Sequence, residues 1–154
     1  MYKACIFDLD GTLTDTLDSL TFSVNETLKE MQLPTILEEQ CRQFVGNGAR
    51  VLMEKAIQAA GGDVQERIEE GMQKYGRIFD LNCTYHVVPY KGIPELLETL
   101  RSRNISLAVL SNKPHRQAVH VVEEIFGEGV FDHIQGQMEG IPRKPDPAAA
   151  LSIA

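Results

Sequence analysis

Residues 4–16, ACIFDLDGTLTDT, decide how the rest of the sequence is interpreted. The apolar residues at the start predict a short buried strand over residues 3–9, and Gly11 and the threonines that follow predict a turn. An ionised carboxylate that leaves water needs a cation or several hydrogen-bond donors beside it. Asp8 and Asp10 therefore either lie in a solvated turn or serve to hold a positively charged group.

The next part of the chain has the spacing of helices. Apolar residues recur at i, i+3, i+7 and i+11 and predict an amphipathic helix that ends before Pro34: Leu17, Leu20, Val24 and Leu28. Further helices are predicted at about 38–45, 49–60 and 64–80, and Gly-containing turns separate them. We expect residues 16–82 to be entirely helical.

Helices and strands alternate after residue 82. The sequence predicts helices at 94–104 and 117–126, strands at 106–110 and 131–135, and a last helix that begins at Pro147. Strands joined by crossover helices form a parallel sheet with right-handed connections. The expected fold is α/β, with a Rossmann-like three-layer core made of residues 1–15 and 83–154 and an inserted helical domain at 16–82.

Polar residues follow each predicted strand of this sheet. In parallel sheets, ligands bind beyond the carboxyl ends of the strands, so these residues are expected to share one edge even though they are far apart in sequence. The three groups are Asp8, Asp10 and Thr12; Ser111, Asn112 and Lys113; and Arg143 and Lys144.

Carboxylates, a hydroxyl, an amide and ammonium groups at one edge suit a phosphoryl group together with a divalent cation. An oxygen-only donor set favours Mg²⁺, and a carboxylate can act as a covalent nucleophile. Other motifs fail. An EF-hand loop beginning at Asp8 would need Gly and Glu where Leu13 and Ser19 stand. A P-loop is absent, and Gly46-Asn47-Gly48 lies between helices.

Composition limits the partners and the compartment. A net charge of −7 argues against nucleic acid and anionic membranes as partners, but not against a small phosphorylated metabolite. No apolar run approaches the ~20 residues of a membrane span, and the N-terminus does not resemble a signal peptide. Three widely spaced cysteines predict reduced thiols rather than a zinc site. We expect a cytoplasmic protein; the sequence does not give its oligomeric state.

Three motifs resemble those of the haloacid dehalogenase-like hydrolases. FDLDGTLTDT at 7–16 is similar to their first motif, AVLSNK at 108–113 to their second and RKPDP at 143–147 to their third. The helical insert matches the family's cap domain, and VGNGARVLMEKA at 45–56 resembles a segment of phosphoglycolate phosphatases. The resemblance covers essentially the whole chain. It implies a Mg²⁺-dependent phosphomonoester hydrolase that forms a phospho-aspartate.

The resemblance also implies roles for individual residues. Asp8 would be the nucleophile and a metal ligand, and Asp10 the general acid and base, with its backbone carbonyl on the metal. Lys144 would offset charge on Asp8 and the phosphoryl group, and Ser111 with the Asn112 backbone would hold phosphoryl oxygens. Thr12 would orient Asp10 or donate a hydrogen bond. Substrate contacts from the cap are expected from Asn47, Gly48 and Arg50, although Arg50 can also be read as a solvated charge.

Two expectations limit this interpretation. The family's fourth motif, an acidic cluster that completes the metal site, is not found before Ala154, so we expect a fragment whose core lacks its C-terminal part and whose first strand is an exposed edge. Two alternatives therefore remain beside the phosphatase: a phosphosugar mutase of the same fold, and a non-catalytic binding or regulatory module. Lys113 is expected to be an exposed loop charge.

Overall fold

A computed structural model describes residues 2–154 and divides the chain into two compact units. The core unit combines the chain up to Asp15 with Val87–Ala154, and the helical unit is Thr16–His86. Residues 83–86, which the sequence assigned to the core, lie in the helical unit, where Tyr85 stacks on Phe22 with ring centroids 4.6 Å apart.

The core unit is built on a parallel sheet, as predicted. Its strands are β1 (Ala4–Phe7), β4 (Ser106–Pro114) and β5 (His133–Gln137), in the order β1-β4-β5. Strand β4 lies in the middle, and its Leu107 and Val109 are fully buried. The α/β class with a parallel sheet is confirmed.

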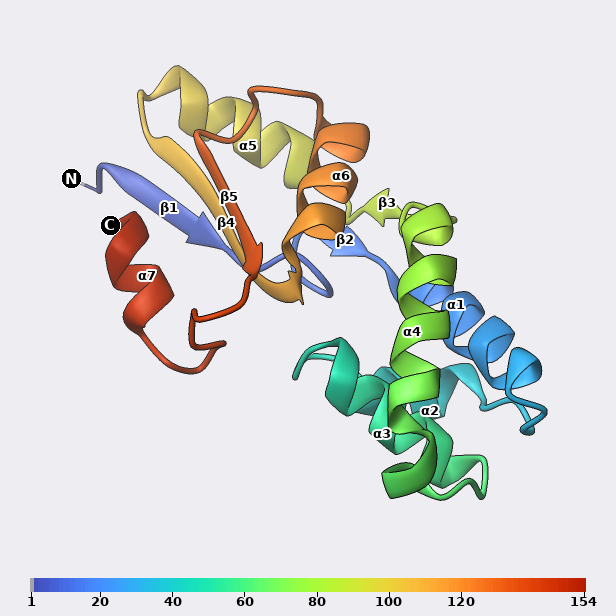
Figure 1. The fold of residues 1–154 in the computed structure, drawn as a ribbon. Coiled ribbons are helices and arrows are strands. Elements are labelled where there is room, and N and C mark those ends of the chain that lie inside the picture. The colour runs from blue at the N-terminus through green and yellow to red at the C-terminus, as the bar shows by residue number, and fades with distance from the viewer. Residues whose placement is uncertain (1) are drawn as a thin grey trace. The chain divides into compact units, whose positions relative to one another are not determined.

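Helices cover both faces of this sheet (Figure 1). Two of them, α5 (Ile93–Ser102) and α6 (His115–Phe126), lie on one face, and α7 (Ala148–Ile153) lies on the other. The placement of α5 and α6 on one face is what right-handed crossovers require when successive parallel strands are added in one direction.

The predicted end of the central strand was wrong. The sequence predicted a strand that stops at Leu110, but β4 continues to Pro114, and its pairing with β5 shifts register between Leu110 and Pro114. The extra residues are polar and were read as loop for that reason. The longer strand places Ser111, Asn112 and Lys113 at the carboxyl end of the sheet.

The helical unit contains α1 (Leu17–Glu30), α2 (Glu38–Phe44), α3 (Ala49–Ala59) and α4 (Val64–Asn82). Helix α4 packs against α1 and α3. Of the apolar stripe expected on α1, Leu20, Val24 and Leu28 are buried and Leu17 is half-buried. At the start of α4, the Asp63 side chain accepts a 3.0 Å hydrogen bond from the backbone N–H of Glu66, which caps the helix.

A short antiparallel ribbon was not predicted. Strands β2 (Thr14–Asp15) and β3 (Val88–Pro89) pair as Thr14 with Pro89 and Asp15 with Val88. Strands of two residues are too short to show the alternation of apolar and polar residues that marks longer strands. Both connections to the helical unit leave from this ribbon.

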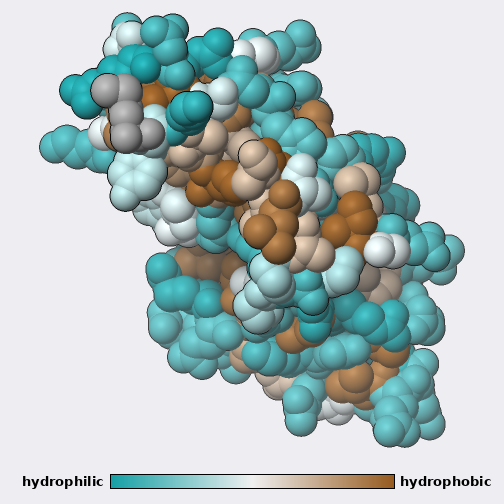
Figure 2. All heavy atoms as spheres, turned by 90° about the vertical axis from the view of Figure 1, so that its left-hand side faces the viewer, coloured by the Kyte–Doolittle hydropathy of each residue, from teal (hydrophilic) through white to brown (hydrophobic). Residues whose placement is uncertain are grey.

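Strand β1 lies at the edge of the sheet. Figure 2 faces the side of the molecule that carries β1 and α7, and hydrophobic side chains gather there. Ile6 of β1 is 39% exposed and Leu151 of α7 is 72% exposed. Across residues 2–154, none of the helices has both the length and the apolar composition that crossing a bilayer requires.

Candidate active site

In the turn after β1, three backbone N–H groups donate hydrogen bonds to a single carbonyl oxygen. Leu9 O accepts hydrogen bonds from the backbone N–H groups of Thr12 at 3.2 Å, Leu13 at 3.0 Å and Thr14 at 3.2 Å. Gly11 has φ +80°, which a residue without a Cβ adopts at little cost. Leu9 and Leu13 are fully buried. They anchor the turn, whereas the Asp8 and Asp10 side chains retain 45% and 16% of their exposure.

Lys144 pairs with the first of these aspartates. Its Nζ lies 2.7 Å from Asp8 Oδ1 and donates a second hydrogen bond of 2.8 Å to Leu110 O. The ammonium is therefore held between the turn after β1 and the carboxyl end of β4. Residues 8 and 144 meet at one edge of the sheet although most of the chain separates them.

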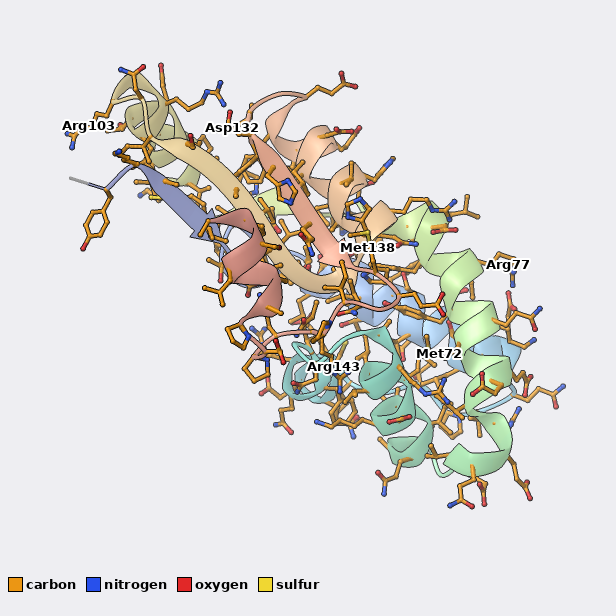
Figure 3. The ribbon with its side chains drawn as sticks, turned by 60° about the vertical axis from the view of Figure 1, so that its left-hand side comes forward. Met72, Arg77, Arg103, Asp132, Met138 and Arg143 are labelled. Atoms are coloured by element: carbon orange, nitrogen blue, oxygen red, sulfur yellow. The ribbon has the colours of Figure 1, made fainter. Side chains whose placement is uncertain are left out.

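The Asn112 side chain fixes the segment that carries Lys144. Asn112 Nδ2 donates to Lys144 O at 3.1 Å, and Lys144 N–H donates to Asn112 Oδ1 at 2.9 Å. This paired contact holds the loop between β5 and α7 against the end of β4. Figure 3 labels Arg143 in the same loop. Sequence reasoning had assigned Asn112 a backbone role only and missed this side-chain role.

Ser111 lies beside these groups at the end of β4 and is 4% exposed. Its Oγ accepts a 3.1 Å hydrogen bond from the Lys113 backbone N–H. A hydroxyl that accepts in this way still carries its own proton. The Ser111 O–H group can therefore donate to an oxygen of a bound ligand.

The expectation that Lys113 is an exposed loop charge was wrong. Its side chain is 2% exposed, and its Nζ lies 2.9 Å from Asp10 Oδ1. The reason is the longer β4, which makes residue 113 part of a strand rather than part of a loop. Sequence reasoning missed this residue, although its place directly after Ser111 and Asn112 was an available signal.

The other predicted substrate contacts are Thr12 in the core unit and three residues of the helical unit. Thr12 is exposed, and its backbone N–H donates to Leu9 O. Asn47, Gly48 and Arg50 belong to the helical unit, where Gly48 precedes α3 with φ +87°.

Arg50 is engaged by acids of its own unit. Its guanidinium lies 2.6 Å from Glu69 and 3.3 Å from Glu54. The hydrogen bond and charge of Glu69 raise the pKa of Arg50 above its usual value. The alternative reading of Arg50 as a solvated charge describes this geometry, since the side chain is 51% exposed.

The donors at the sheet edge fit a magnesium ion. Mg²⁺ is held in proteins by one or two carboxylates, and water and substrate phosphates complete its octahedron. The carboxylate of Asp8, whose side chain is 45% exposed, and the backbone carbonyl of Asp10 are oxygen donors that suit such an ion. Within residues 2–154, no group of three or more His, Cys, Asp or Glu forms a candidate metal cluster. A carboxylate and a carbonyl oxygen fit a Mg²⁺ ion whose other ligands are water and substrate oxygens.

The opposite end of the sheet has a structural network instead. Asp132, labelled in Figure 3, precedes β5 and accepts a 2.8 Å hydrogen bond from Leu107 N–H. Its own N–H donates to Leu107 O at 2.8 Å. By contrast, the acids, the lysines and the Ser111 hydroxyl lie at the carboxyl ends of the strands, where parallel sheets bind ligands.

Comparison with known proteins shows which family the chain resembles. A family model described as "Haloacid dehalogenase-like hydrolase" matches residues 5–153. The chain is 34% identical over 155 residues to the phosphoglycolate phosphatase of Pseudomonas savastanoi pv. phaseolicola, covering 98% of this chain and 56% of that protein. It is 30% identical over 149 residues to the phosphoglycolate phosphatase of Aquifex aeolicus, covering 97% of this chain and 67% of that one.

Solved structures share the fold. The crystal structure of a predicted phosphoglycolate phosphatase from Haemophilus somnus 129pt superposes with a TM-score of 0.91 at 28% identity, over 99% of this chain and 70% of that chain. CbbY from Rhodobacter sphaeroides superposes with a TM-score of 0.78 at 21% identity, which supports the fold alone. The chain spans little more than half the length of the Pseudomonas relative.

Proposed function

Because this chain belongs to the haloacid dehalogenase-like hydrolase family, we propose that it is a phosphomonoester phosphatase that works through a phospho-aspartate on Asp8. The single observation that carries the proposal is the pairing of both aspartates with lysines at one edge of the sheet, Asp8 with Lys144 at 2.7 Å and Asp10 with Lys113 at 2.9 Å. Acids alone would repel a phosphate ester, whereas acids countered by cations can approach one.

The first step is attack of an Asp8 carboxylate oxygen on the phosphorus of the ester. The bond between phosphorus and the ester oxygen breaks, and that oxygen takes a proton from Asp10, so an alcohol leaves. Lys144 offsets the negative charge shared by Asp8 and the phosphoryl group, and the Ser111 hydroxyl donates to a phosphoryl oxygen.

The second step returns Asp8 to its starting state. Asp10, now a carboxylate, takes a proton from water, and the resulting hydroxide attacks phosphorus. The bond between phosphorus and Asp8 breaks, inorganic phosphate leaves and Asp10 is protonated again.

Magnesium would be held by the carboxylate of Asp8 and the backbone carbonyl of Asp10. When bound, the ion supplies charge neutralisation to the phosphoryl oxygens.

The proposed substrate class is a small phosphorylated acid or sugar, and phosphoglycolate is the first compound to test. The names of the Pseudomonas and Aquifex relatives support this choice. Asn47, Gly48 and Arg50 remain proposed substrate contacts. Arg50 would have to exchange Glu69 for the carboxylate of the substrate, because the two are paired at 2.6 Å.

The test is turnover of p-nitrophenyl phosphate and phosphoglycolate, with and without Mg²⁺, by the wild-type chain and Asp8→Asn. We expect Mg²⁺-dependent turnover by the wild type only, and a single phosphoryl group on the Asp8 peptide by mass spectrometry after rapid quenching.

Asp132→Asn is the matched control. Asn can still accept the hydrogen bond from Leu107 N–H at the far end of the sheet, so this variant should retain activity. Turnover that persists in Asp8→Asn would eliminate the covalent mechanism. Phosphate binding without turnover in the wild type would favour a binding module.

A further inference from the structure

Lys113 is the most deeply buried charged side chain that the proposed reaction does not use. It is 2% exposed and follows directly after Ser111 and Asn112 in β4. A lysine is rarely buried to this degree unless it is paired, because moving an ammonium out of water is costly. Its partner is Asp10, with Nζ 2.9 Å from Oδ1.

We propose that Lys113 is a positioning residue that fixes the orientation of the Asp10 carboxyl group. The inference rests on the proposed function, in which Asp10 gives and takes the proton. Asp10 lies in the turn after β1, whereas Lys113 belongs to the central strand. The buried ion pair therefore ties a turn residue to the central strand of the sheet.

The contact also distinguishes the two oxygens of Asp10. Lys113 bonds to Oδ1, so we assign proton transfer to Oδ2. When Oδ2 loses its proton to the leaving oxygen, Asp10 becomes a carboxylate. The Lys113 Nζ, 2.9 Å from Oδ1, lies beside the carboxylate that has formed and offsets its charge.

Each aspartate has a lysine of its own. Lys144 pairs with Asp8 at 2.7 Å and is 30% exposed, so it can also reach a bound phosphoryl group. The buried ammonium of Lys113 pairs with Asp10. We therefore expect loss of Lys113 to impair leaving-group protonation selectively, and loss of Lys144 to impair phosphoryl transfer from every substrate to Asp8.

The test compares Lys113→Met with two other variants. Lys113→Arg retains the cation, and Lys91→Met makes the same substitution at an exposed lysine of the core unit. The two substrates are phosphoglycolate, whose alkoxide needs a proton to leave, and p-nitrophenyl phosphate, whose phenolate leaves without one. The measured quantity is kcat/KM, which reports the steps up to and including phosphoryl transfer.

We expect Lys113→Met to lose about 10²-fold or more in kcat/KM for phosphoglycolate, in the range that a positioned general acid contributes, and about tenfold or less for p-nitrophenyl phosphate. Lys113→Arg should recover part of the loss, and Lys91→Met should match the wild type for both substrates. A crystal structure of Lys113→Met should show the Asp10 carboxyl group rotated away from its wild-type position.

Equal losses for the two substrates would overturn the proposal, as would an Asp10 side chain that stays in place in the Lys113→Met crystal. If the wild type turns over neither substrate, the proposed function fails. The position of the Asp10 carboxyl group in the Lys113→Met crystal then still shows whether Lys113 orients it. If Lys113→Met does not fold, Lys113→Arg takes its place. A larger loss of kcat/KM by Lys113→Arg for phosphoglycolate than for p-nitrophenyl phosphate, each relative to Lys91→Met, would support the proposal. Equal losses for the two substrates would refute it.

Discussion

Asn112 connects two segments of the site through its side chain, although the sequence suggested only a backbone role. Its amide makes hydrogen bonds of 3.1 and 2.9 Å with the backbone of Lys144. We expect Asn112→Ala to lower the free energy of unfolding by about 1–3 kcal/mol, the net value of two hydrogen bonds. Because Lys144 is then no longer held, activity should fall on the order of 10²-fold. Urea unfolding and turnover of p-nitrophenyl phosphate measure the two effects.

Asn112→Asp is the graded control. It keeps an oxygen that accepts from Lys144 N–H, but it loses the donor to Lys144 O. Its loss of activity should fall between the wild type and Asn112→Ala. An alanine variant with wild-type activity would mean that the loop is held by other contacts.

Because Cys41 is buried, we expect the stability of the helical unit to fall at alkaline pH. The thiol is fully buried, and burial raises the pKa of Cys41. Unfolding returns the thiol to its ordinary pKa of about 8.5. The stability it provides is fully present below that value and is lost as pH rises toward the higher pKa of the folded state, because only the unfolded chain releases the proton.

The measurement is urea unfolding at several pH values from neutral to alkaline. We expect the wild type to lose stability more steeply above the ordinary thiol pKa than Cys41→Ala does. The comparison concerns slopes, because the alanine variant also loses packing at every pH. Identical slopes would show that Cys41 does not cause the effect.

The residues of the candidate site were predictable to different degrees. Asp8, Asp10, Ser111 and Lys144 stood out because each follows a predicted strand. Lys113 did not, because a charged residue in a presumed loop is usually exposed. Its burial depends on how far β4 continues, which the polar sequence of residues 111–113 hides.

Among the elements, the close packing of β5 against the junction of β4 and α6 requires a glycine. A Cβ added to Gly136 would lie 2.5 Å from His115 Cα and 2.6 Å from Lys113 O. Both neighbours are backbone atoms and cannot rotate away. We expect Gly136→Ala to destabilise the chain by about 1–3 kcal/mol, the usual cost of overpacking, as measured by thermal or urea unfolding.

Gly76→Ala is the matched control in α4, where a Cβ would meet no atom within 4 Å. Alanine is the better helix former, so this variant should be more stable by about 0.4–1 kcal/mol. The two substitutions add the same methyl group and should act in opposite directions. A neutral Gly136→Ala would mean that β5 can move away from the junction.

Most elements were predictable because their apolar residues follow the period of a helix or a strand. The stripe on α1 and the apolar runs of β1 and β4 gave the order of elements and the parallel sheet. The ribbon of β2 and β3 could not be predicted, because its two strands are too short to show a period and lie far apart in the sequence. Gly136 also contacts His115 only in the folded structure, so no local sequence pattern predicts this contact.

At the scale of the whole molecule, each unit has a buried core of its own. In the helical unit, Phe79 is 1% exposed and stacks on Tyr75 with ring centroids 5.1 Å apart. We expect residues 16–86, produced alone, to fold into the four helices, since domains of about 60 residues do fold independently. Circular dichroism should show helical content and a cooperative thermal transition.

Phe79→Ala in the isolated segment is the control. Truncation of a buried Phe costs about 3–5 kcal/mol, which a small domain rarely has to spare. The variant should therefore lose the cooperative transition. A wild-type segment that melts without cooperativity would indicate that the helical unit depends on the core for its stability.

The ribbon of β2 and β3 has a consequence for how such a protein can be altered. Asp15 and Val88 are partners across one rung, so the segment between them starts and finishes at the same place. A two-residue Asn-Gly turn there would make an ordinary hairpin. The sheet therefore sets no limit on the length of the segment inserted between Asp15 and Val88. Other segments whose ends meet can be inserted at the same rung while the turn that carries Asp8 and Asp10 stays unchanged.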